Sequence, residues 1–156
     1  MKKSLGLYET ISKSVITLNL RSRKSDGVLK ELVSLLEVDP KAKDILLKTL
    51  IKREEMGSTG LGKRIAIPHA RTLLVKEFHL IIGLSRKGVE FESFDKKPVQ
   101  LFFLLIAPPL ETSSSYLITL GKIAGLAKAI AKDGRLFGVK DKKEFFDILG
   151  EIEKKG

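Results

Sequence analysis

Two stretches in the first third of the chain carry apolar residues at the spacing of one helix face. Ser25 or Asp26 can cap the first predicted helix, whose apolar positions are Val28, Leu29, Leu32, Val33 and Leu36. Asp39 followed by Pro40 supplies a cap and a proline at the first helical position. A second helix is therefore predicted from there to about residue 55, with apolar positions at Ile45, Leu46, Leu50 and Ile51.

The middle of the chain reads as short strands separated by turns. An alternating run at residues 15–18 precedes the helices, and apolar segments at 65–67, 78–84 and 99–106 predict strands. The segment 99–106 is continuously apolar, so we expect a central strand buried on both faces. Residues 57–62 include Gly57, Gly60 and Gly62, which favour positive φ, and this segment is predicted to be a loop without regular structure.

Two further helices are predicted near the C-terminus. The first runs from about residue 112 to 132, is ended by Gly134, and is expected to turn inward Leu117, Leu120, Ile123, Ala124, Ala127 and Ile130. The second opens with Asp141 and Glu144 at capping-box spacing and should bury Phe145, Ile148, Leu149 and Ile152. Interleaved helices and strands without a repeat or linker predict an α/β fold in which residues 1–156 form a single domain, a mixed β-sheet flanked by helices.

Composition removes several classes of chemistry. The chain has no cysteine, which excludes disulfides, thiolate metal sites and cysteine nucleophiles. It also has no long apolar run, and together these features predict a soluble, unexported, cytoplasmic protein with no stable membrane insertion.

The 29 Lys and Arg residues against 19 Asp and Glu give a net charge of +10. That charge suits nucleic acid, an anionic surface, an acidic partner or a phosphorylated ligand. Because the lysines are scattered among glutamates and aromatics make up 6% of the chain, nucleic-acid binding is kept only as a minority hypothesis.

The segment from Gly57 to Lys63 has the letters of a nucleotide phosphate-binding loop, G-x-x-x-x-G-K. Arg64 stands where that motif needs a hydroxyl group for Mg²⁺. The flanking elements read helix, loop, strand, whereas a nucleotide-binding loop requires strand, loop, helix. We therefore interpret the match as accidental.

The chain has two histidines, and only His69 has a context that suggests chemistry. It follows Pro68 at the end of a predicted strand, and Lys63, Arg64 and Arg71 can create a positive field around it. A neutral imidazole held there can attack a phosphoryl group while cations and backbone N–H groups stabilise the transferred charge. His79 alternates with apolar neighbours in a strand and is expected on the opposite sheet face from them, partly exposed or hydrogen-bonded, and without a chemical role.

Residues 53–69, which read REEMGSTGLGKRIAIPH, resemble the signature segment of enzyme IIA of the fructose/mannitol class of the bacterial sugar phosphotransferase system, including its nitrogen-regulatory branch. The resemblance extends to residues 88–91, 95, 98–108 and 117–133. It implies that His69 accepts a phosphoryl group from a small histidine-containing phosphocarrier protein. The group is then passed to a IIB component or serves as a regulatory state, in which case the partner is a regulated transporter or kinase. The resemblance further implies that Arg53 stabilises the phosphoryl group, that Thr59 is a possible donor, and that no cofactor or metal is required.

One position departs from the family pattern. Members commonly carry a second histidine near the start of the long helix, and here the matching residue is Tyr116. A phenol can donate one hydrogen bond but does not become cationic near neutral pH. The alternative hypothesis is therefore a regulatory binding protein that keeps the fold but signals without phosphorylation. Since no fused transporter or IIB segment is recognised in the sequence, the resemblance favours the regulatory branch, with a sugar-specific IIA still open.

Overall fold

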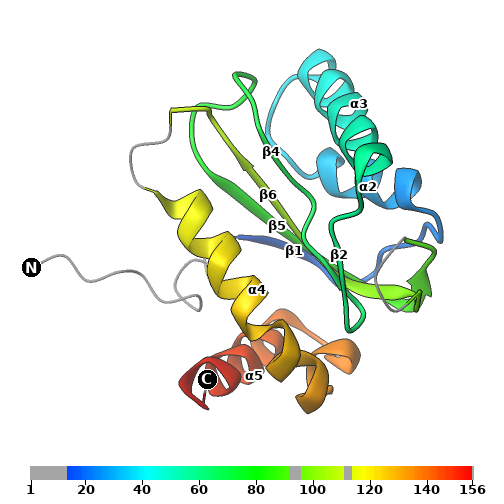
Figure 1. Ribbon diagram of the computed structural model, residues 1–156, viewed down its shortest axis with the longest axis vertical. Helices are drawn as coiled ribbons and strands as arrows, with labels where there is room; N and C mark the ends of the chain where they lie inside the picture. Colours follow the sequence, from blue (N-terminus) through cyan, green and yellow to red (C-terminus); the bar gives the residue numbers. More distant parts are fainter. Residues whose placement is uncertain (1–13, 92–95, 111–113, 156) are drawn as a thin grey trace, which may run out of the picture.

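The computed structural model describes residues 14–91, 96–110 and 114–155, and within these ranges one mixed β-sheet forms the centre of the molecule (Figure 1). Its strands follow the order β1-β5-β6-β3-β2, and β4 also pairs with β6, in line with β3. The strands are β1 (Val15–Thr17), β2 (Gly60–Gly62), β3 (Ile65–Ala66), β4 (His69–Arg71), β5 (His79–Val89) and β6 (Val99–Ala107).

The pairing directions confirm the predicted mixed sheet. Strand β1 runs parallel to β5, β5 runs antiparallel to β6, and β6 runs parallel to both β3 and β4. Strand β6 therefore has neighbours on both sides, and residues 101–107 have no exposed surface. This confirms the prediction that the continuously apolar segment is the central strand. Each large apolar side chain buried in this way contributes roughly 1.5–3 kcal/mol.

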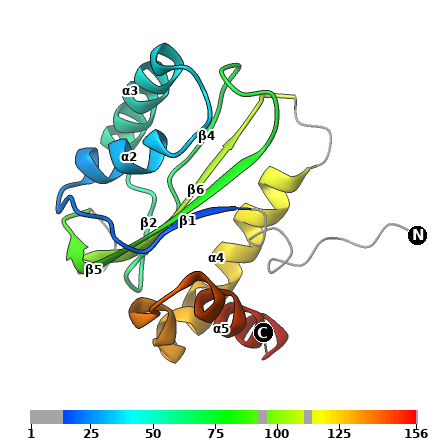
Figure 2. The ribbon, with the colours of Figure 1, turned by 180° about the vertical axis from the view of Figure 1, so that it is seen from behind.

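Helices cover both faces of the sheet (Figures 1 and 2). On one face, α2 (Ser25–Ser34) and α3 (Pro40–Met56) pack against the even-numbered residues of β6, such as Phe102 and Leu104. On the other face, α4 (Ser115–Asp133), the 3₁₀ turn η1 (Arg135–Gly138) and α5 (Lys142–Lys155) pack against the odd-numbered ones, such as Phe103 and Leu105. Within the described ranges, no helix is both long and apolar enough to cross a membrane.

The helix ends follow most of the sequence signals. Asp39 accepts a hydrogen bond from the backbone N–H of Ala42 at 2.9 Å, with Pro40 in the first turn, as predicted. Gly134 ends α4 at φ +78°, and Asp141 accepts from the N–H of Glu144 at 2.8 Å. The predicted cap of α2 is wrong, because that helix begins at Ser25 itself and its N-cap residue is Lys24, which makes no side-chain cap.

The inward face of α4 differs from the predicted one. Leu117 is 57% exposed, and Ala124 is exposed as well, whereas Tyr116 and Thr119 are 5% and 2% exposed. The helix begins at Ser115, and the stripe that faces the sheet is Tyr116, Thr119, Ile123, Ala127 and Ile130. Counting only apolar residues misplaced the start of this stripe, because one of its positions is a buried threonine. The predicted start at residue 112 lies outside the described residues.

The glycine-rich segment was predicted to lack regular structure, and this is wrong for its second half. Strand β2 pairs antiparallel with β3, with Gly60 opposite Ala66 and Gly62 opposite Ile65. The two residues between Gly62 and Ile65 form the turn, and both have positive φ, as a type I′ hairpin requires. Neither is glycine, so about 1–2 kcal/mol of backbone strain at each must be offset elsewhere.

Contacts of Arg64 offset part of that strain. Its guanidinium lies 3.9 Å from the centre of the Phe137 ring and donates to the side-chain oxygen of Gln100 at 2.9 Å. Its carbonyl oxygen accepts from the backbone N–H groups of Gln100 and Leu101 at 2.9 and 3.1 Å. The hairpin is thus tied to β6 and to η1 by a residue that the sequence suggested as a neighbour of His69.

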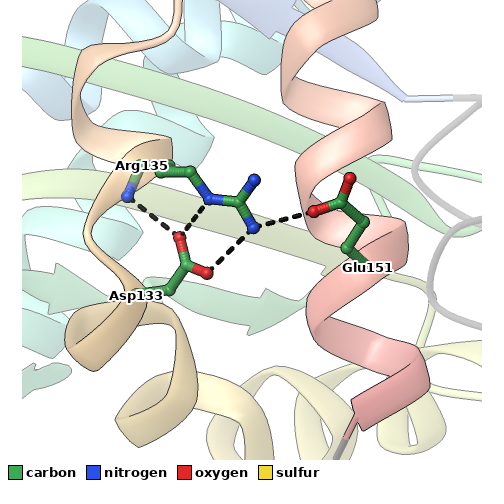
Figure 3. Close-up of polar contacts among 3 residues, drawn as sticks. All are labelled: Asp133, Arg135 and Glu151. Atoms are coloured by element: carbon green, nitrogen blue, oxygen red, sulfur yellow. Dashed lines mark hydrogen bonds and ion pairs between the residues drawn. The ribbon is translucent and has the colours of Figure 1, made fainter.

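A small ion-pair cluster joins the end of α4 to α5 (Figure 3). The Arg135 guanidinium contacts the Asp133 carboxylate at 2.8 Å and the Glu151 carboxylate at 2.8 Å. The hydrogen bond from Arg135 lowers the pKa of Asp133, and the two carboxylates raise the pKa of Arg135. All three groups face solvent, so the cluster orients the two helices more than it stabilises them.

Candidate functional site

His69 begins β4 at the edge of the sheet. It pairs with Leu105 of β6, and the carbonyl oxygen of Pro68 accepts from the Leu105 N–H at 3.0 Å. Strands β3 and β4 pair with β6 one after the other, and they are separated at Ile67 and Pro68. Pro68 lacks an N–H group and so cannot donate a hydrogen bond to β6. His69 is therefore the first residue of β4 and does not simply follow the end of the preceding strand. Its side chain is partly exposed.

The imidazole is oriented by the backbone two residues earlier. Nδ1 of His69 lies 2.6 Å from the carbonyl oxygen of Ile67. A carbonyl oxygen can only accept, so Nδ1 carries the proton and Nε2 keeps its lone pair. The ring is thus held in the tautomer that offers Nε2 as a nucleophile.

Thr59 contributes to this orientation through its backbone. Its carbonyl oxygen accepts from the N–H of Ile67 at 3.1 Å. Its hydroxyl group donates to the Glu54 carboxylate, which also accepts from the Thr59 N–H at 3.1 Å. Thr59 is 7% exposed. The structure therefore places Thr59 behind Ile67, with its hydroxyl turned toward the Glu54 carboxylate of α3, and its possible role as a donor to the phosphoryl group stays a prediction.

Tyr116 packs edge-to-face beside His69. The two ring centres lie 6.2 Å apart at an interplanar angle of 61°, and Phe78 forms a second such pair with Tyr116 at 6.5 Å. Burial raises the pKa of the Tyr116 phenol, while the positive charges of Arg71 and Arg53 act in the opposite direction. Tyr116 is thus a buried neighbour of the imidazole that stays neutral well above physiological pH.

Arg71 approaches the same tyrosine from β4. Its guanidinium carbon lies 4.7 Å from the centre of the Tyr116 ring, and Nη1 donates to the carbonyl oxygen of Pro109 at 3.1 Å. Because His69 and Arg71 are two residues apart in one strand, their side chains leave the same face. Sequence reasoning named Arg71 only as part of a general positive field, and the signal that singles it out is this spacing of two.

Arg53 lies in the last turn of α3, on the other face of the sheet. It is exposed, and its Nη1 donates to the carbonyl oxygen of Gly57 at 2.7 Å. Burial raises the pKa of the Tyr116 phenol, and the positive charge of Arg53 weakly opposes that rise. Helix α3 also lies against β4. The structure therefore brings Arg53 to the same edge of the sheet as His69.

Lys63 and Arg64 do not take part in this cluster. They form the tip of the β2–β3 hairpin, beside Gln100 and Leu101, whereas His69 pairs with Leu105. Four to five residues along a strand correspond to roughly 13–17 Å. The cations that act on the Tyr116 phenol beside His69 are therefore Arg71 and Arg53, and not these two residues.

The other histidine, His79, starts β5 and is partly exposed. It alternates with Phe78 and Leu80, which pack against the α4 and α5 side of the sheet. This agrees with the expectation that His79 is partly exposed and lies on the opposite sheet face from its two neighbours, and its lack of a chemical role stays a prediction.

The chain matches the family described as the phosphoenolpyruvate-dependent sugar phosphotransferase system, EIIA 2, over residues 9–152. A nitrogen regulatory protein of Bradyrhizobium diazoefficiens is 32% identical over 147 residues, which are 93% of this chain and 95% of that protein. A fructose-specific EIIABC component of Bacillus subtilis is 30% identical over 152 residues, or 96% of this chain. The chain spans only 24% of that longer relative.

Solved structures show the same fold. The nitrogen regulatory protein IIA-Ntr from Neisseria meningitidis superposes with a TM-score of 0.77 at 30% identity, covering 92% of this chain and 98% of that one. The enzyme IIAMTL solved in complex with phosphorylated enzyme IIBMTL from Escherichia coli gives a TM-score of 0.66 at 16% identity, covering 90% and 94%. At that identity the second likeness concerns the fold alone.

Proposed function

Because the chain belongs to the EIIA 2 family of the phosphoenolpyruvate-dependent sugar phosphotransferase system, we propose that His69 is the residue on which it carries a phosphoryl group. A phosphocarrier or regulatory role in that system is the function of the chain, as its relatives among fructose EIIA components and nitrogen regulatory proteins indicate. The observation that carries the proposal is the 2.6 Å contact between His69 Nδ1 and Ile67 O, which leaves Nε2 as the nucleophile.

The transfer needs no proton movement at His69. The lone pair of Nε2 attacks the phosphorus atom of the donor, a new N–P bond forms, and the donor's own N–P bond breaks with its electron pair returning to the donor imidazole. The proton of His69 stays on Nδ1, where the Ile67 carbonyl oxygen stabilises the positive charge that the ring gains. The donor is proposed to be the small histidine-containing phosphocarrier protein, and the transfer is proposed to take place in the cytoplasm.

Electrostatic stabilisation comes from the arginines. A phosphoryl group on His69 brings negative charge to a place where Arg53 already acts on the neighbouring phenol. A guanidinium presents several N–H groups in a plane and can bind two phosphoryl oxygens at once. We therefore assign Arg53 to binding the phosphoryl oxygens during transfer.

Exposed apolar side chains near the site support a protein as the donor and acceptor. Leu110 and Leu73 are both 89% exposed, Met56 is 79% exposed, and Leu117 is 57% exposed. Each lies within three residues of Arg53, Arg71, Pro109 or Tyr116 in the chain. Apolar residues grouped around a charged centre are typical of protein docking surfaces. A IIB component is the proposed acceptor in a transport role, since an enzyme IIA of this fold has been solved bound to an enzyme IIB.

The proposal is tested by incubating the protein with phosphoenolpyruvate, enzyme I and the histidine phosphocarrier, and measuring its intact mass. We expect an acid-labile gain of one phosphoryl group in the wild type and in His79→Gln, and none in His69→Gln. Phosphorylation that persists in His69→Gln would contradict the assignment. A wild-type protein that gains nothing from a cognate donor would instead support the phosphorylation-independent regulator, with Tyr116 the first residue to examine.

A further inference from the structure

Arg71 and His69 share one aromatic neighbour. The Arg71 guanidinium lies over the face of the Tyr116 ring at 4.7 Å, and the His69 ring meets Tyr116 edge-to-face at 6.2 Å. Both side chains leave β4 toward α4 because they are two residues apart. The strand and the tyrosine together bring a permanent cation next to the imidazole.

Arg71 is held in place before any phosphoryl group arrives. The ring of Tyr116 is 5% exposed, so it gives the guanidinium a fixed surface. The bond from Nη1 to the Pro109 carbonyl oxygen fixes the far end of the side chain and uses one of its five N–H donors. Fixing a long side chain in advance lowers the entropy that binding would otherwise cost.

Besides its fixed position, Arg71 contributes its positive charge to the site. Burial raises the pKa of the Tyr116 phenol, and two cationic neighbours oppose that rise, Arg71 more strongly than Arg53. Any anion placed beside this phenol is therefore influenced by a guanidinium from β4 and by one from α3. Tyr116 itself has no positive charge to offer, because a phenol titrates between neutral and anionic forms.

We propose that Arg71 is a second phosphoryl-binding cation of the His69 site and that Tyr116 is the platform that positions it. The inference rests on the proposed function. Arg71 makes and breaks no covalent bond: as the N–P bond forms at Nε2 of His69, its free N–H groups donate to the phosphoryl oxygens opposite Arg53. The pair of arginines clamps the group from the two faces of the sheet.

The test compares the rate of phosphoryl transfer from the phosphorylated histidine phosphocarrier to wild type, Arg71→Gln and Arg71→Lys. We expect Arg71→Gln to slow transfer roughly tenfold and to shorten the lifetime of the phosphorylated form, since a charge-assisted bond at a partly exposed site is lost. Arg71→Lys keeps the charge but not the planar group and should fall between the two. Far-UV circular dichroism and thermal unfolding establish that each variant is folded.

Arg86→Gln is the matched control. Arg86 is another exposed arginine whose guanidinium donates to a loop carbonyl, that of Val139, so its removal costs the same charge and the same kind of bond. Leu105 of β6 pairs with both His69 and Leu80. Arg86 lies six residues farther along β5 than Leu80, so it is roughly 20 Å from the site. Equal rates in Arg71→Gln and Arg86→Gln would overturn the inference.

A rescue experiment separates a charge at the site from a merely structural role. Arg71→Lys restores a positive charge at the same position without the planar group, so we expect the phosphorylated form of Arg71→Lys to last longer than that of Arg71→Gln at the same pH. Equal lifetimes in the folded Arg71→Lys and Arg71→Gln proteins would contradict a role for positive charge. If wild type itself is not phosphorylated, the proposed function and this inference fail together, whereas a phosphorylated wild type with a fully active Arg71→Gln removes only the inference.

Discussion

His69 and Tyr116 meet edge-to-face, with ring centres 6.2 Å apart, and Tyr116 is 5% exposed. The tyrosine is therefore a part of the core as well as a neighbour of the imidazole. Its ring and its hydroxyl group can be separated by substitution, because phenylalanine keeps the shape and loses only the oxygen.

We expect Tyr116→Phe to retain transfer within about threefold of wild type, because the ring that carries Arg71 remains. Tyr116→Leu removes that ring, so its transfer rate should fall roughly tenfold and its free energy of unfolding by about 2–3 kcal/mol. Quenched time-course assays measure the rate of transfer, and urea unfolding measures the free energy of unfolding. A Tyr116→Phe protein with a much shorter phosphohistidine lifetime would show that the phenol oxygen itself holds the phosphoryl group.

The ionisation of Tyr116 reports on Arg71 directly. Burial raises the pKa of the phenol and Arg71 lowers it, so Arg71→Gln should raise it further. Ultraviolet titration in a Tyr8→Phe background follows Tyr116 alone, since the chain has two tyrosines. An unchanged titration midpoint in Arg71→Gln would mean that the two groups are not close in solution.

The raised phenol pKa also sets a pH limit on stability. In the unfolded chain Tyr116 ionises near pH 10, before it does in the folded protein, so alkali draws the equilibrium toward the unfolded state. The contribution is fully present below about pH 10 and is lost as the pH rises through the folded-state pKa. We expect the stability of Tyr116→Phe to fall less steeply than that of wild type as the pH rises through this range, as measured by thermal unfolding at each pH.

Arg53→Ala should slow phosphorylation by roughly tenfold while the fold stays intact, because this side chain is exposed. The lost bond to the Gly57 carbonyl should reduce the free energy of unfolding by only about 0.5–1.5 kcal/mol. Lys52→Ala, one residue earlier on an exposed part of α3, is the control for the loss of charge. Near-wild-type transfer in Arg53→Ala would remove this arginine from the site.

Thr59 is expected to act through position rather than by direct contact. Thr59→Val keeps the volume but loses the hydroxyl bond to the partly buried Glu54 carboxylate, and should cost about 1–3 kcal/mol of unfolding free energy. Transfer should slow as well, since the Thr59 carbonyl holds Ile67 and Ile67 orients His69. Thr59→Ser should restore both properties. Slow transfer at unchanged stability in Thr59→Val would indicate direct phosphoryl contact instead.

Local signals predicted much of the fold. Asp39 with Pro40, and Gly134, mark helix ends through caps that depend only on neighbouring residues. The apolar run of β6 predicted a central strand because only a fully covered strand can dispense with polar positions. What failed needed tertiary information: Gly60 pairs with a strand that follows the turn, and Thr119 occupies a buried position that a count of apolar residues cannot reveal.

For the candidate site, too, some residues could be predicted from the sequence, whereas the place of others depends on packing. His69 could be proposed from the residues around it, and Arg53 and Tyr116 from the family resemblance. Arg64 was placed near His69 because it is close in sequence, but the β2–β3 turn carries it to Phe137. The place of Arg71 over Tyr116 depends on how α4 packs against β4, which no local pattern contains. The catalytic roles of these residues remain predictions for the experiments above.

The most direct test is to identify the nitrogen that carries the phosphoryl group. The protein is labelled with ¹⁵N at histidine, phosphorylated by the histidine phosphocarrier, and examined by NMR for ¹⁵N–³¹P coupling. With Nδ1 of His69 bonded to the Ile67 carbonyl oxygen, we predict coupling to Nε2 of His69 and none to His79. Coupling to Nδ1 of His69, or to either nitrogen of His79, would contradict the proposed site.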